Sequence, residues 1–215
     1  MTDDFTLPVL IVGAGGHAKV LPDLLRVAGR PVYGLSDADP AAAELKLPGE
    51  TIIGDDAAAM ALPVDSVAIA VGVGATRAGD SREKLYEIFA ARGFAMVTVI
   101  HPSATIANGV EISDGAQIMA GAVIQPDTVI GANVVVNTGA TVDYDCRIGD
   151  HAFIAPGVTL CGGVLVGAGA HVGAGATVLE YRSVGDNATV GGGALVDADV
   201  PAGKTVCGVP ARPTR

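Results

Sequence analysis

The chain has 215 residues, a formal net charge of −10, and half of its residues are hydrophobic. This length allows one or two domains with a sizeable core. The acidic balance argues against a nucleic-acid or anionic-membrane binder, because either would need a basic face. No apolar run reaches the roughly 18 residues of a membrane span, and the acidic start MTDDFTLP is unlike a signal peptide. We therefore expect a soluble, cytoplasmic protein.

The first hundred residues alternate short apolar runs with stretches typical of helices. We expect strands at 7–13, 31–37, 51–54, 66–72 and 95–100. Helices are expected at 17–29 and 82–93, with a short Ala-rich helix after the third strand. Alternation of this kind predicts a parallel sheet with helices on its faces. Residues 1–100 are accordingly expected to form a Rossmann-like α/β domain.

From about residue 101 the pattern changes to a repeat of six. Sixteen positions in steps of six are all aliphatic: Ile106, Ile112, Ile118, Ile124, Ile130, Val136, Val142, Ile148, Ile154, Leu160, Val166, Val172, Val178, Val184, Val190 and Val196. Small or β-branched residues stand two positions before nearly every one of them, and Arg182 is the clear exception. A hexapeptide repeat is typical of a parallel β-helix. A β-sandwich would instead show alternation with period two, which is absent here.

A second period of eighteen lies on the first, through Gly131, Gly149, Gly167 and Gly185. Three hexads therefore make one coil of a triangular prism, with each marker aliphatic pointing inward. We assign residues 101–200 to this β-helix. The register breaks after Val196, and the proline-rich residues 201–215 are expected to form a terminal loop that caps the last coil.

A glycine-rich stretch between the first strand and the first helix satisfies G-x-G-x-x-G/A. Its residues Gly13, Gly15, Gly16 and His17, with Asp37 at the end of the next strand, suit a nucleotide whose phosphate approaches the backbone. A glycine turn needed only for packing remains an alternative. About 100 residues leave no room for the second half of a dinucleotide site, so a nucleotide with one diphosphate fits better than NAD. Arg77 follows a later turn at the same sheet edge, as a phosphate ligand or, more simply, a surface charge.

Polar corners stand out in the β-helix at Asn137 and at Tyr144-Asp145. The three cysteines form no CxxC pair, so neither a disulfide framework nor a metal site is indicated. Cys146 occupies an inward position and is expected in the core, whereas Cys161 is a small corner residue. The tail carries Lys204, Arg212 and Arg215 without an acid. A polyanionic cosubstrate would find its positive partners there, although a tail that is basic for solubility is an equal alternative.

The whole chain resembles the bacterial hexapeptide acyltransferases that acetylate nucleotide-linked amino sugars, such as bacillosamine and perosamine N-acetyltransferases and sialic-acid O-acetyltransferase relatives. The resemblance runs through VGAGGHAK, HPSATI, VNTGATVDYDC, IGDHAFIAPGVTLCGGV and VCGVPAR. It implies a left-handed β-helix, a homotrimer, acetyl-CoA in the groove between neighbouring helices, and a sugar nucleotide on the N-terminal domain. By position it implies that Gly13, Gly15, Gly16, His17 and Asp37 hold the nucleotide sugar. It further places Phe153, Gly162, Lys204, Val209 and Pro210 at CoA, and Asn137 near the reacting centre.

One departure from the family concerns the catalytic base. The family usually has a histidine at Tyr144, followed by an acid matched by Asp145, and that histidine takes a proton from the sugar amine. A second family histidine corresponds to Phe153. This chain instead has His171, eighteen residues later and therefore one coil above Phe153. Tyrosine, with a reference pKa near 10, is a poor base at neutral pH.

Three hypotheses follow. Solvent deprotonates the amine while the site supplies only proximity; or His171 serves as a displaced base; or catalysis is lost and the protein binds its ligands only. The sequence favours an acetyl-CoA-dependent sugar N-acetyltransferase of surface-glycan biosynthesis. An O-acetyltransferase, a catalytically impaired binding protein and an NAD-linked sugar enzyme are the alternatives. No metal, nucleic-acid or membrane partner is expected.

Overall fold

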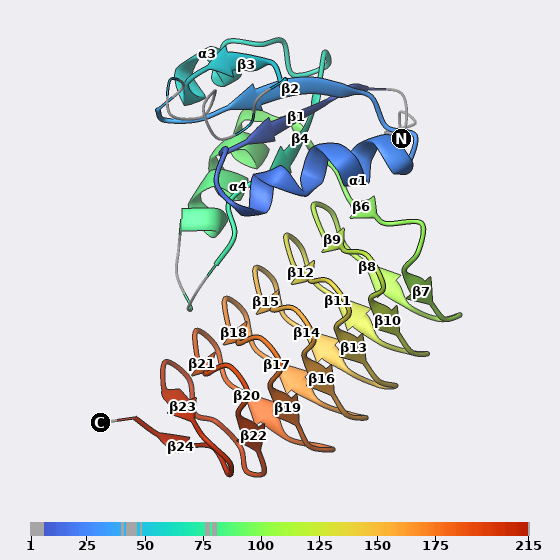
Figure 1. Cartoon of the computed structure of the whole chain (residues 1–215), viewed down its shortest axis with the longest axis vertical. Helices are drawn as coiled ribbons and strands as arrows, with labels where there is room; N and C mark the ends of the chain where they lie inside the picture. The colour runs from blue at the N-terminus through green and yellow to red at the C-terminus, as the bar shows by residue number, and fades with distance from the viewer. Residues whose placement is uncertain are drawn as a thin grey trace. The chain divides into compact units, whose positions relative to one another are not determined.

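A computed structural model describes residues 7–39, 41, 47, 49–75, 78 and 81–214. The chain divides into two compact units, Met1–Gly74 with Ser81–Val99, and Ala75–Asp80 with Ile100–Arg215. Figure 1 shows an α/β sheet in the first unit and stacked coils in the second. None of the helices in these ranges is long and apolar enough to cross a bilayer.

The first unit is built on a five-stranded parallel sheet in the order β3-β2-β1-β4-β5. Its strands are β1 (Val9–Val12), β2 (Val32–Ser36), β3 (Ile52–Gly54), β4 (Ala68–Val71) and β5 (Ala95–Met96). Both β1 and β4 are buried over their whole length, as expected of central strands covered on both faces. The strand order changes direction between β1 and β4. In open parallel sheets, ligands bind at the carboxyl ends of the strands beside such a switch point.

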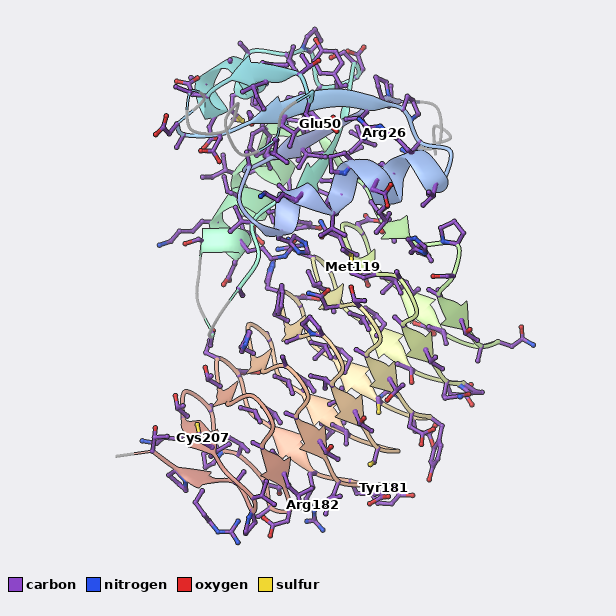
Figure 2. The ribbon with its side chains drawn as sticks, viewed as in Figure 1. Arg26, Glu50, Met119, Tyr181, Arg182 and Cys207 are labelled. Carbon is purple, nitrogen blue, oxygen red and sulfur yellow. The ribbon has the colours of Figure 1, made fainter. Side chains whose placement is uncertain are left out.

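The helices with described bounds in this unit are a 3₁₀ turn, η1 (His17–Lys19), followed by α1 (Leu21–Val27), α3 (Asp56–Met60) and α4 (Ser81–Arg92). The expected continuous helix at 17–29 is wrong, because Pro22 has no amide to bond back across the preceding turn. Asp55 caps α3 by accepting from the Ala58 amide at 3.0 Å. Arg26 of α1 donates to both carboxylate oxygens of Glu50, at 2.8 and 2.7 Å (Figure 2).

The second unit is a parallel β-helix whose strands, two residues long except for the three-residue β23, are arranged in three walls. The first wall contains β7 (Thr105–Ile106), β10 (Val123–Ile124), β13 (Thr141–Val142), β16 (Thr159–Leu160), β19 (Thr177–Val178) and β22 (Leu195–Val196). The second contains β8 (Glu111–Ile112), β11 (Val129–Ile130), β14 (Arg147–Ile148), β17 (Leu165–Val166) and β20 (Ser183–Val184). The third contains β6 (Val99–Ile100), β9 (Gln117–Ile118), β12 (Val135–Val136), β15 (Phe153–Ile154), β18 (His171–Val172), β21 (Thr189–Val190), β23 (Thr205–Cys207) and β24 (Arg212–Pro213).

Strand pairing confirms the eighteen-residue coil, since Val129 pairs with Arg147 and Ile130 with Ile148. Every marker aliphatic from Ile118 onward is buried, whereas Ile106 and Ile112 in the first coil are only half-buried. The single strand expected at 95–100 is wrong. It splits into β5, which pairs with β4, and β6, which belongs to the third wall.

The C-terminal residues do more than cross the last coil. Val200 bridges Val184 and Thr205 pairs with Thr189, so the spacing shortens from eighteen residues to sixteen while the stack continues. β24 then turns back antiparallel to β23. The expected terminal loop therefore begins with a further, shorter coil of the β-helix. Arg212 forms an ion pair of 2.7 Å with Asp197.

Candidate functional site

Two glycine-containing loops meet at the switch point of the first unit. The loop after β1 begins at Gly13, whose φ of +89° is left-handed. A Cβ atom there would also clash with the Val73 side chain, at 2.6 Å from Cγ2. In the loop after β4, a Cβ at Gly72 would clash with the Gly13 carbonyl oxygen. Gly13 and Gly72 are therefore required by the close approach of the two loops.

Gly15 and Gly16 are different, because a Cβ at either would meet nothing within 4 Å. Gly16 has an ordinary φ of −59°, so neither packing nor backbone conformation explains why this position lacks a side chain. Open space above a strand-to-helix glycine loop is what a phosphate needs in order to reach the backbone. His17 follows directly and is half-buried. It packs against Gly74, where an added Cβ atom would lie only 3.0 Å from the His17 Cβ.

Asp37 stands at the end of β2 and is half-buried. One carboxylate oxygen accepts from the Ala14 amide at 2.6 Å, and the other accepts from the Asp39 amide at 3.0 Å. Asp37 therefore fixes the glycine loop that follows β1 through its bond to the Ala14 amide. The sequence did not predict this role. Contact with a ribose remains a prediction for this residue. Arg77 lies outside the described residues.

Arg82 is a functional candidate that the sequence reasoning missed. It is the second residue of α4, in the charged stretch SREK that reads as a solvated face, yet it is only 4% exposed. Its Nη1 donates to the carbonyl oxygens of Val71 at 2.8 Å and Val73 at 2.9 Å. Burial lowers the pKa of Arg82 to about 9, which leaves the guanidinium charged at neutral pH.

In the β-helix, Tyr144 lies at the edge between the first and second walls, which we call the first edge. Its ring covers Gly162, where a Cβ would clash with the ring, and the Tyr181 ring covers Gly163 in the same way. Tyr144 is 43% exposed and Tyr181 69% exposed. Figure 2 shows Tyr181 and Arg182 along this edge of the prism. Gly162, which was expected to face CoA, thus lies beneath a tyrosine ring.

The environment of Tyr144 makes it a weaker acid than ordinary tyrosine. A hydrogen bond with Tyr181 is the main cause that raises its pKa, and Asp143 and Glu180 add to the effect. The phenol therefore stays protonated at neutral pH, with its proton held in the hydrogen bond with Tyr181. It does not supply the base that the family places here.

The neighbours of Tyr144 complete this edge. Asp145 takes the left-handed corner conformation, with φ +58°, and is exposed. Cys146 is buried in the core as expected, and burial raises its pKa to about 11. Burial likewise raises the pKa of the Cys161 thiol, with help from Glu180. Neither thiol has the depressed pKa of a cysteine nucleophile.

His171 lies on the outer face of the third wall and is 5% exposed. It pairs with Phe153 in the neighbouring strand, and the two rings stack at 5.4 Å with an interplanar angle of 14°. The prediction that His171 stands one coil above Phe153 is confirmed. Its Nδ1 is buried without a hydrogen-bond partner in the described part of the chain, and burial lowers its pKa. The ring is therefore neutral at pH 7, and its Nδ1 is buried beneath the surface of the third wall.

The predicted residues of the β-helix lie on different parts of one prism. Asn137 follows β12 at the edge between the third and first walls, where its side chain accepts from the Thr138 amide at 2.7 Å. Tyr144 and Asp145 lie at the first edge, and His171 lies on the third wall. One chain therefore does not bring Asn137, Tyr144 and His171 together.

The tail residues expected at CoA are accessible. Lys204, Val209 and Pro210 are all exposed, and Val209 precedes Pro210 through a cis peptide bond. Two shallow grooves lie on the outer walls. One, of about 350 Å³, is on the second wall around Arg147 and Leu165, and one of about 190 Å³ is on the first wall around Asp143 and Cys161. No cluster of three metal-binding side chains occurs among the described residues.

Comparisons with known proteins match both units. The model of the PglD N-terminal domain matches residues 8–97, and that of the bacterial transferase hexapeptide (six repeats) matches 109–143 and 145–180. No significant match occurs among curated proteins. Among solved structures, PerB from Caulobacter crescentus in complex with CoA and GDP-perosamine is 37% identical, with a TM-score of 0.90 over 98% of both chains.

Two further structures agree with this result. The acetyltransferase domain of PglB from Neisseria gonorrhoeae, in complex with acetyl coenzyme A, is 34% identical with a TM-score of 0.87, over 96% of this chain and 98% of that one. WeeI from Acinetobacter baumannii is 26% identical with a TM-score of 0.84, over 97% of this chain and all of that one. The likeness therefore extends over both units and is not confined to the hexapeptide repeats.

Proposed function

This chain belongs to the family of bacterial hexapeptide-repeat sugar acetyltransferases, and we propose that it transfers an acetyl group from acetyl-CoA to the amine of a nucleotide-linked amino sugar. Its β-helix is left-handed, as the family implies. The observation that carries the proposal is the likeness over 98% of both chains to an enzyme solved with CoA and GDP-perosamine. Following the resemblance to the bacterial hexapeptide acyltransferases, we assign the reaction to surface-glycan synthesis. A cytoplasmic location remains a prediction.

The open glycine loop of the first unit supports the nucleotide-sugar part of the proposal. Gly15 and Gly16 lack side chains for no reason of packing, which fits a diphosphate lying against their amides. We assign His17 to contact with the same ligand. Asp37, which holds the Ala14 amide, would keep the loop in place and offer its remaining lone pairs to the nucleoside.

The chemistry requires the amine to lose a proton as it attacks the thioester. A C–N bond forms, the C–S bond breaks, and the proton from the amine is finally carried by the CoA thiol. Tyr144 does not accept this proton, because its raised pKa keeps the phenol already protonated at neutral pH. We assign it instead an orienting role as a neutral phenol, whose oxygen can accept a hydrogen bond from the reactants while its proton is shared with Tyr181. Asp145 lies beside it, and we assign Asn137 a similar orienting role.

His171 is the best candidate for the base among the described side chains. Its lowered pKa keeps the imidazole neutral at pH 7, and the stacked Phe153 ring fixes its orientation. A neutral imidazole can accept the amine proton, and loss of such a base typically costs a hundredfold or more in rate. The competing account is a base-free site that works by proximity and by exclusion of water.

We propose that the chain forms a homotrimer, as the resemblance implies, and the arrangement of the site residues supports a site shared between copies. Asn137 and Tyr144 lie on different edges of one prism, so a groove between two neighbouring copies would bring them to one site. We assign Phe153, Gly162, Lys204, Val209 and Pro210 to the acetyl-CoA binding groove. Of these, Gly162 contributes through the Tyr144 ring that covers it.

A product analysis tests the proposal. The protein is incubated with acetyl-CoA and GDP- or UDP-linked amino sugars, and the sugar nucleotide is examined by mass spectrometry. We expect one acetyl group that resists mild base, as an amide does. A base-labile product would identify an O-acetyltransferase. Binding of both ligands without any acetylated product would identify a binding protein that has lost catalysis.

A further inference from the structure

Arg82 supports the loop that follows β4 through two hydrogen bonds to its backbone. A guanidinium that donates to two carbonyl oxygens of one loop, at 2.8 and 2.9 Å, fixes the orientation of two peptide planes at once. These planes are the peptides Val71–Gly72 and Val73–Gly74. Because Arg82 is almost wholly buried and charged, these hydrogen bonds are little weakened by water.

The orientation of each carbonyl also sets the direction of the next amide. In a planar trans peptide the N–H points opposite to the C=O. The Gly72 N–H accordingly turns away from Arg82 and donates to the Val12 carbonyl at 2.7 Å, which ties β4 to β1. The same geometry turns the Gly74 N–H away from Arg82. Within the described ranges this second amide has no backbone acceptor, so it remains able to bind a ligand.

The Arg82-supported loop is interlocked with the first glycine loop. Gly72 contacts the Gly13 carbonyl so closely that no side chain fits between them, and Gly74 lies against His17. A shift of the loop that Arg82 holds would therefore displace the loop that bears Gly15 and Gly16. Both loops begin at the carboxyl ends of the two strands that flank the switch point.

We propose that Arg82 is a positioning residue for the diphosphate group of the nucleotide sugar. It holds the Gly74 amide toward the ligand side of the loop, and its buried charge strengthens the positive potential of the loop amides. The two peptides that Arg82 contacts direct their carbonyl oxygens toward the guanidinium and their N–H groups toward the opposite side. The positive charge and the peptide dipoles therefore both raise the potential on the N–H side. This inference rests on the proposed function, since it assigns a role at the nucleotide-sugar site.

The test compares Arg82→Met and Arg82→Lys with Arg92→Met, an exposed arginine on the same helix. Binding of GDP and UDP to the full chain is measured by titration calorimetry, and KM is measured separately for the sugar nucleotide and for acetyl-CoA. We expect Arg82→Met to weaken nucleoside diphosphate binding by at least about tenfold, from the loss of charge-assisted hydrogen bonds. Its KM for the sugar nucleotide rises while its KM for acetyl-CoA stays unchanged.

Arg82→Lys keeps the charge but cannot hold both carbonyls with a planar group, so it should restore part of the binding. It also decides the question if Arg82→Met fails to fold. Arg92→Met should behave as the wild type. Wild-type affinity for GDP and UDP in both Arg82 variants, or equal losses for the nucleotide and for acetyl-CoA, would overturn the proposal, as would a wild type that binds neither GDP nor UDP.

The binding measurement separates this proposal from the proposed function. If the wild type binds a nucleoside diphosphate through Arg82 but transfers no acetyl group, the positioning role stands and the acetyltransferase function falls. If acetyl transfer proceeds with its usual KM values in Arg82→Lys and Arg82→Met, the function stands and the positioning role falls.

Discussion

In the proposed reaction, the fate of the amine proton depends on two side chains, Tyr144 and His171. The Tyr144 phenol is held protonated by its hydrogen bond to Tyr181 and by nearby carboxylates. The His171 ring is held neutral by burial and has one buried nitrogen with no hydrogen-bond partner in the described part of the protein. The residue at the family's usual position is thus a protonated phenol, while the residue that we propose as the base lies on the third wall, opposite the first edge.

Replacing His171 with Asn tests this assignment. The side chain keeps similar hydrogen-bonding groups but cannot accept the amine proton, so kcat should fall by about a hundredfold or more. Tyr144→Phe serves as the comparison and should have a mild effect, because it removes only a hydrogen bond. Steady-state thiol release for the three proteins gives the answer.

The complementary variant is Tyr144→His, which places a group of pKa near 6.5 beside Asp145. If His171→Asn leaves the rate unchanged while Tyr144→His raises it strongly, His171 is not the base and the wild-type enzyme works without one. If His171→Asn is slow and Tyr144→His restores its rate, the displaced-base account stands.

Burial of His171 also predicts how the stability of the fold depends on pH. Its folded-state pKa lies below the unfolded value of about 6.5, so on acidification the unfolded chain takes up a proton before the folded one. Stability is therefore lost as the pH falls below about 6.5, until the folded pKa is reached. Denaturant titrations from pH 7.5 to 5 should show a shallower loss for His171→Phe than for the wild type. Parallel curves would mean that His171 is not the group that titrates.

At the scale of elements, the sequence predicted the strands that follow the hexapeptide repeat. It did not predict features that depend on one local contact and have no repeat. The hexad rule located the β-helix strands from β7 to β22, because each inward aliphatic meets the same environment in every coil. The break at Pro22 and the change of sheet between β5 and β6 arise from local events without a period. Arg82 was missed because its sequence neighbours are charged, and burial of one arginine among them leaves no trace in the pattern.

The contact between Tyr144 and Tyr181 at the first edge was not predicted from the sequence, although the sequence carries a signal for it. Stepping by eighteen from Asp145 passes Gly163 and reaches Tyr181, at a corner whose φ is positive. A tyrosine in a left-handed corner is unusual and indicates a special role. Its partner Tyr144 belongs to the adjacent column, two coils away, so only the three-dimensional stack shows that the two side chains interact.

The strand β16 offers a direct test of the inward and outward faces. Leu160 points into the prism and is fully buried, while Thr159 beside it is exposed. Leu160→Ala should lower the free energy of unfolding by about 2–5 kcal/mol, through lost burial and the cavity that it leaves. Thr159→Ala should change it by no more than about 0.5 kcal/mol. Equal effects in denaturant unfolding would contradict the assigned register.

At the scale of the whole molecule, the proposal requires that chains associate. One chain leaves Leu165 48% exposed on its second wall and two tyrosines exposed on the adjoining edge. Together with the groove around Arg147 and Leu165, we take this surface as the candidate contact between copies. We expect sedimentation equilibrium at micromolar concentration to give a trimer with cyclic symmetry. A stable monomer at that concentration would contradict the trimer and, with it, an acetyl-CoA groove between neighbouring helices.

The most direct test of the central claim is the release of CoA thiol. The protein is mixed with acetyl-CoA and, one at a time, with nucleotide-linked amino sugars, the same nucleotides without an amino sugar, and NAD. We predict thiol release that needs a nucleotide amino sugar, scales with protein concentration, and does not occur with NAD or with the nucleotide alone. Absence of thiol release with every nucleotide amino sugar, in a protein that binds acetyl-CoA and a nucleoside diphosphate, would contradict the account.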